Sequence, residues 1–97
     1  MPYISQDKRV KFENIIKELD NSVIDNPGEL NYVITNVCLK YIKHNGINYT
    51  NLNSVSGVLN CVWEEIKDRI MRNYEYSKRI KNGDLEIYKK LEQVIKN

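Results

Sequence analysis

The sequence has little of what catalytic and metal-binding sites are usually made of. Its 97 residues include one histidine and two cysteines, Cys38 and Cys61, which are too far apart for a C-x-x-C motif. Structural zinc sites take about four clustered cysteine, histidine or acidic ligands, and disulfide frameworks need several regularly spaced cysteines. We therefore expect no metal, no cofactor and no disulfide, and interpret both cysteines as small apolar side chains.

Long hydrophobic runs are also lacking. No run of about 18 apolar residues is present, and the N-terminus has no basic segment followed by an apolar one, as secretory signals do. We therefore expect a cytoplasmic protein without a membrane segment. The scarcity of glycine (4) and proline (2), with 41% hydrophobic and 29% charged residues, is typical of a folded chain. The length fits one domain, residues 1–97.

Apolar residues recur every three or four positions and predict four helices, at about residues 5–24, 27–44, 51–81 and 84–96. Ser5 is the expected N-cap of the first helix. Asn26, Pro27 and Glu29 fall at the N-cap, first and third positions of the second, as in a capping box. Gly46 follows basic residues at the end of this helix, where a left-handed residue is favoured.

The third predicted helix is long, because no proline or glycine lies between Gly57 and Gly83. At about 1.5 Å per residue it would reach roughly 45 Å. A compact domain of this size has a radius of gyration of about 13 Å and a diameter near 32 Å. The helix must bend, or be covered by the C-terminal helix or by a second copy of the chain. We expect an all-α small helical bundle, built on an antiparallel hairpin of the second and third helices, which forms a homo-oligomer.

Catalytic groups are not apparent. His44 lies near the end of the second helix, where it complements the helix dipole. Glu64 and Glu65 are adjacent on a helix and point about 100° apart, so they do not share a site. There is no glycine-rich phosphate loop. We expect a protein that is not an enzyme.

Polar and small residues accompany the apolar stripes of the second and third helices. Such stripes suit either close helix packing or a ligand pocket, and the sequence does not decide between them. Gly57 is interpreted as serving close approach, since a glycine inside an exposed helix costs about 1 kcal/mol relative to alanine. The stripes comprise Asn31, Thr35, Cys38 and Ile42 on the second helix, and Ser54, Gly57, Val58 and Cys61 on the third.

Eight residues form the predicted ligand-binding set. The second helix would supply hydrogen bonds, aromatic rings a stacking wall, and arginines a positive charge for phosphate. Residues 67–90 hold eight basic and four acidic residues, which suits either a solvated helix face or an anion-binding surface. The set is Asn31, Tyr32, Thr35 and Asn36 for hydrogen bonding, Tyr49 and Trp63 for stacking, and Arg69 and Arg72 for charge.

Four segments resemble a family of short bacteriophage and prophage proteins of unknown function over residues 1–84. They are MPYI, NPGELNYVIT, INYTNLNSVSGVLNCVWEEI and YEYSKRIKNGD. This chain continues with LEIYKKLEQVIKN, where the family pattern usually ends. It also reads VWEEIKDRI where the family commonly has a lysine-containing stretch and an aromatic–arginine pair.

The resemblance implies a phage protein acting by binding in the host cytoplasm, and it assigns no active site. Our first hypothesis is an oligomer that sequesters a nucleotide-type host immune signal between subunits. The alternative is a protein-interaction module that inhibits a host protein through residues 74–80. Nucleic-acid binding through residues 67–90 is a third hypothesis, for which affinity would fall steeply with salt.

Overall fold

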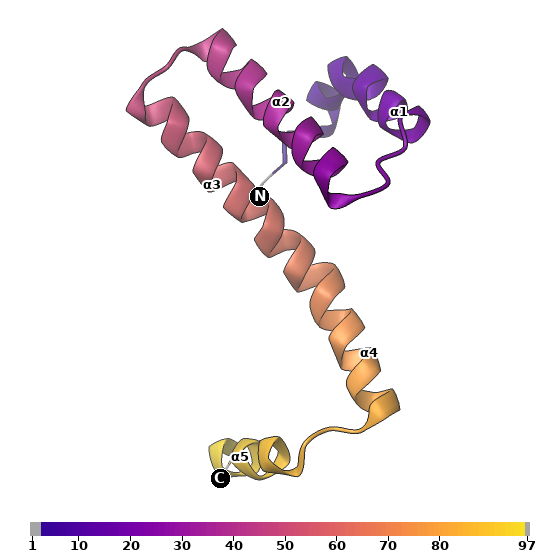
Figure 1. The fold of residues 1–97 in the computed structure, drawn as a ribbon. Helices are drawn as coiled ribbons and strands as arrows, with labels where there is room; N and C mark the ends of the chain where they lie inside the picture. The colour runs from indigo at the N-terminus through magenta and orange to yellow at the C-terminus, as the bar shows by residue number, and fades with distance from the viewer. Residues whose placement is uncertain (1–2, 97) are drawn as a thin grey trace. The chain divides into compact units, whose positions relative to one another are not determined.

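The computed structural model describes residues 3–96, and all regular secondary structure in this range is helical (Figure 1). The all-α prediction is therefore confirmed. The chain forms two units, residues 1–58 and 59–97. The elements are η1 (Gln6–Phe12), α1 (Glu13–Asn21), α2 (Pro27–Asn45), α3 (Tyr49–Ile66), η2 (Lys67–Met71), α4 (Arg72–Asn82) and α5 (Glu86–Lys96).

The N-terminal segment differs from the single α-helix predicted for residues 5–24. It starts with the 3-10 helix η1, in which the Lys8 N–H donates to the Ser5 carbonyl over 3.1 Å, and α-helical geometry begins only at Glu13. Ser5 occupies the N-cap position, but its side chain makes no capping bond. The spacing of apolar residues predicts which face of a helix is apolar. It does not predict whether each N–H donates to the carbonyl three or four residues earlier, so the 3-10 geometry was not predicted.

The start of α2 has the predicted capping geometry. The Asn26 side chain accepts a hydrogen bond from the Glu29 N–H at 2.9 Å. The Glu29 carboxylate accepts in return from the Asp25 N–H and from the Asn26 side-chain amide, each at 3.0 Å. Pro27 occupies the first turn, where its missing N–H is not needed. Asn26 is extended, at φ −150° and ψ 167°, because the residue before a proline avoids the α region.

A short turn reverses the chain between α2 and the first part of α3, which run in opposite directions (Figure 1). Gly46 ends α2 at φ 110°, as its place in the sequence predicted. Asn48 caps α3 by accepting from the Asn51 N–H at 2.9 Å. The Asn51 side chain then donates to the carbonyls of Asn45 at 3.1 Å and Gly46 at 2.9 Å. Asn51 thus satisfies carbonyls that the end of α2 leaves free.

The long helix predicted for residues 51–81 runs from Tyr49 to Asn82, through α3, η2 and α4, a length of 34 residues. Its five-residue segment η2 has π geometry, with the Arg72 N–H bonded to the Lys67 carbonyl. Such a turn widens the helix and rotates the side chains after it relative to those before it. Gly83, at φ 89°, ends the helix with its N–H bonded to the Arg79 carbonyl at 2.8 Å.

The last helix, α5, starts two residues later than the predicted 84–96. The Asp84 carboxylate accepts from the Leu85 N–H at 2.8 Å before the helix begins at Glu86. Ile87, Tyr88 and Leu91 on this helix are all exposed.

A bundle core is the main predicted feature that the described residues do not form. No residue within 3–96 is buried, and the apolar stripes of the helices are exposed in both units. The apolar stripe of α2 includes the exposed residues Leu30 and Ile34, and that of α3 includes Leu52 and Leu59. Periodicity predicts an apolar face but not what covers it, and neither unit by itself forms the buried core that a bundle requires.

Removing the Asn51 side chain tests the turn. We expect Asn51→Ala to lower the free energy of unfolding by about 1–2 kcal/mol, because the half-buried Gly46 carbonyl and the exposed Asn45 carbonyl lose their donor. Urea unfolding followed by circular dichroism, at one fixed protein concentration, measures the change. Asn53→Ala on the same helix is the matched control, since its side chain is exposed and takes no part in the turn. An equal loss in both variants would contradict the role given to Asn51.

Candidate functional site

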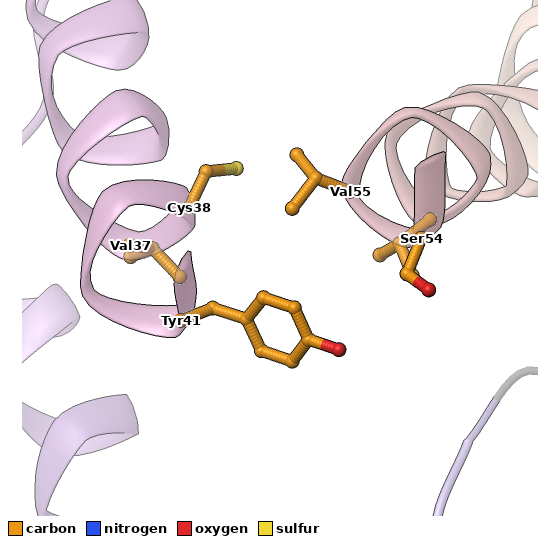
Figure 2. Close-up of a pocket in the computed structure, with 6 residues that line it drawn as sticks. Val37, Cys38, Tyr41, Ser54 and Val55 are labelled. Carbon is orange, nitrogen blue, oxygen red and sulfur yellow. The ribbon is translucent and has the colours of Figure 1, made fainter. Parts of the chain in front are cut away.

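The first unit contains a groove between α2 and α3 (Figure 2). Its volume is about 200 Å³. Figure 2 shows Val37, Cys38 and Tyr41 on the side of α2 that faces Ser54 and Val55 of α3. Val58 completes the lining. No charged side chain takes part, so the groove suits apolar groups rather than an anion.

Exposure varies along this groove. Cys38, Ser54 and Val55 are half-buried, whereas Val37 and Val58 are 62% and 60% exposed. The two helices therefore shield each other only in part. What remains open is a mostly aliphatic surface that both helices share.

Four of the predicted ligand-binding residues lie together on the first turns of α2. The Thr35 hydroxyl donates to the Asn31 side-chain oxygen at 3.0 Å, and the Asn36 side chain donates to the Tyr32 carbonyl at 2.9 Å. These four residues line a shallow depression with Pro27 and Gly28. Since several of their polar atoms bond within the helix, the Asn31 amide and the Tyr32 ring are the groups best placed to meet a ligand.

The other four predicted residues do not line this depression. Tyr49, at the first position of α3, is 84% exposed, and Trp63 lies in the second unit. Arg69 and Arg72, also in the second unit, pair with Glu65 at 3.3 Å and Asp68 at 3.7 Å. The proposed phosphate-binding arginines thus have acidic neighbours on their own helix, although exposed pairs of this kind are weak.

The helix start at α2 also offers little to an anion. A free helix N-terminus attracts phosphate through its N–H groups and dipole. Here the Glu29 N–H is bonded to Asn26, and the Glu29 carboxylate lies at the same helix end. Its negative charge opposes a second anion at this position.

Three groove residues, Cys38, Ser54 and Val58, belong to the stripes that the sequence assigned to close helix packing or a ligand pocket. Val37, Tyr41 and Val55 were not among the predicted site residues. One feature of the sequence could have indicated the groove, namely the absence of charge near it. All 15 basic and 13 acidic residues lie outside residues 45–63, so most of α3 has no charge on any side. Charged side chains are rarely buried, so a helix surface that lacks them is easier to cover.

Gly57 does not serve the close packing that was predicted for it. A Cβ atom built on Gly57 would meet nothing within 4 Å. Within the described structure, no close helix packing occurs at this glycine, and the other interpretation, the close approach of a ligand, stays a prediction.

Further site types are not seen in the described part of the chain. Residues 3–96 contain no group of three or more histidine, cysteine or acidic side chains placed to hold a metal ion. None of the described helices is long and apolar enough to cross a membrane.

Comparison with known protein families matches residues 1–85 to a domain of unknown function, DUF6899. The chain belongs to this family. The match agrees with the resemblance noted over residues 1–84, but it shows no phage origin. No curated protein and no solved structure matches the chain. The DUF6899 match includes the α2–α3 groove and the long helix, and it ends before α5.

Replacing Gly57 tests the open space beside it. At a dilution where the chain is monomeric, we expect Gly57→Ala to raise the free energy of unfolding by about 1 kcal/mol, because alanine favours the helix and its methyl group meets no atom in the chain. Thermal unfolding followed by circular dichroism measures this. Gly83→Ala serves as a contrast: at φ 89° a side chain is strained, so that variant should be less stable. A destabilised Gly57→Ala would mean that something else packs on this face.

Proposed function

We propose that this protein is a non-enzymatic interaction protein whose helical apolar faces bind another protein chain. The observation that carries the proposal is that none of the residues 3–96 is buried, although apolar side chains follow one face of most helices. Helices in water gain most of their stability from covering such faces. A partner that supplies the cover explains both the pattern and its exposure. The bundle expected from the sequence would be completed by helices from more than one chain.

Sequestration of a nucleotide-type signal is the second candidate. The exposed Asn31 amide and Tyr32 ring, side by side on α2, favour it. The ion pairs of Arg69 and Arg72 and the carboxylate of Glu29 weaken it, because each places negative charge where a phosphate would bind. Protein binding therefore has the stronger support.

Measurements on the isolated chain test the first candidate. At high dilution we expect the full chain to bind the dye ANS and to exchange its backbone amides rapidly, because its apolar faces are uncovered. A binding partner should suppress the dye signal and slow the exchange. A chain that light scattering shows to be monomeric, with slowly exchanging amides and no dye binding, would contradict the proposal.

Native mass spectrometry with cyclic dinucleotides and mononucleotides tests the second candidate. If protein binding is the function, no nucleotide should be retained by the chain or by its complexes. Retention that is lost in Asn31→Ala and Tyr32→Ala, but kept in Asn53→Ala, would instead favour nucleotide sequestration.

A further inference from the structure

We propose that the α2–α3 groove is an interface with a second copy of this chain, the two grooves meeting about a two-fold axis. This inference rests on the proposed function and names its partner. In one chain the groove residues are partly exposed. The second copy would cover these exposed side chains, so that two grooves together form one buried interface.

The chemistry of the groove restricts the partner. Its walls are aliphatic or aromatic apart from the Ser54 hydroxyl, the Tyr41 hydroxyl and the Cys38 thiol. The run without charge, residues 45–63, includes every α3 residue of the groove and the whole turn before it. A partner that binds through charge would find no opposite charge on residues 49–63 of α3.

A second copy fits this surface for a reason of symmetry. In a two-fold interface, each residue near the axis lies close to its own equivalent. Charged residues would then meet like charges, which is unfavourable. Valine meets valine without penalty, and serine, threonine and asparagine side chains can each donate and accept. In the α3 segment Tyr49–Val58, every residue is a valine, serine, threonine or asparagine except three, which are also uncharged: Tyr49, Leu52 and Gly57.

The exposure of the groove residues leaves apolar surface for a dimer to cover. Val37, Tyr41 and Val58 are 62%, 43% and 60% exposed in the first unit. A homodimer interface of about 2,000–5,000 Å² takes about 1,000–2,500 Å² from each chain, and apolar side chains exposed to this extent are the kind of surface that such an interface covers.

A pair of matched variants tests the interface. Val58 in the groove and Val10 in η1 are 60% and 61% exposed in the single chain. We expect light scattering to show a dimer for the unchanged full-length chain. Val58→Glu should weaken the dimer by about 100-fold or more, because a carboxylate would be buried without a partner. Val10→Glu should leave it unchanged. A dimer that tolerates Val58→Glu, or that Val10→Glu weakens equally, would overturn the proposal.

An NMR measurement on the unchanged protein avoids dependence on variant folding. A sample that mixes isotope-labelled and unlabelled chains reports contacts between subunits only. We expect such contacts from the methyl groups of Val37, Val55 and Val58. A dimer with none at these methyl groups would overturn the interface.

The outcomes also separate this inference from the proposed function. A monomer that binds ANS and becomes protected by a different protein would overturn the self-association and leave the proposed function standing. A monomer with slowly exchanging amides and no dye binding would overturn both.

Discussion

An amphipathic helix in water depends on a cover for its apolar face, and this constraint governs the whole chain. Hydrogen bonds along the backbone do not replace it, since helix formation alone is marginal for segments shorter than about 12–15 residues. The helices α1 and α5 are only 9 and 11 residues long, and neither has a buried residue. Their stability therefore depends on packing that buries their apolar faces, and neither helix has such packing within its own unit.

Local signals made some elements predictable. The capping geometry at Asn26 and Glu29 and the left-handed end at Gly46 followed from residue type at fixed positions, because each depends only on neighbours within four residues. The long helix was expected for a similar reason: no proline interrupts Tyr49–Asn82, and the one glycine inside it has space around it. These features need no knowledge of distant contacts.

Features that depend on competition or on tertiary contacts were not predictable. In the 3-10 helix η1 the backbone N–H groups bond to carbonyls three residues earlier instead of four. The spacing of apolar residues does not predict this difference. Among the predicted ligand residues, Asn31 and Thr35 were placed on one face correctly, but their mutual hydrogen bond was not foreseen. Arg69 and Arg72 were predicted to bind phosphate because of their charge. Glu65 and Asp68 lie one turn earlier on the same helix and form ion pairs with them, which the spacing of four residues could have indicated.

The family match bears on which surface matters. It covers residues 1–85, which contain the hydrogen-bonded turn, the groove and the charge-free part of α3, and it leaves out α5. If the exposed apolar helix faces had to be covered mainly by α5, the family domain, residues 1–85, would not contain the segment that covers it. If other copies of the domain cover these faces through α2 and α3, α5 is not needed. The groove is therefore the first place to test the proposed self-association, and α5 adds a second apolar face outside the family match.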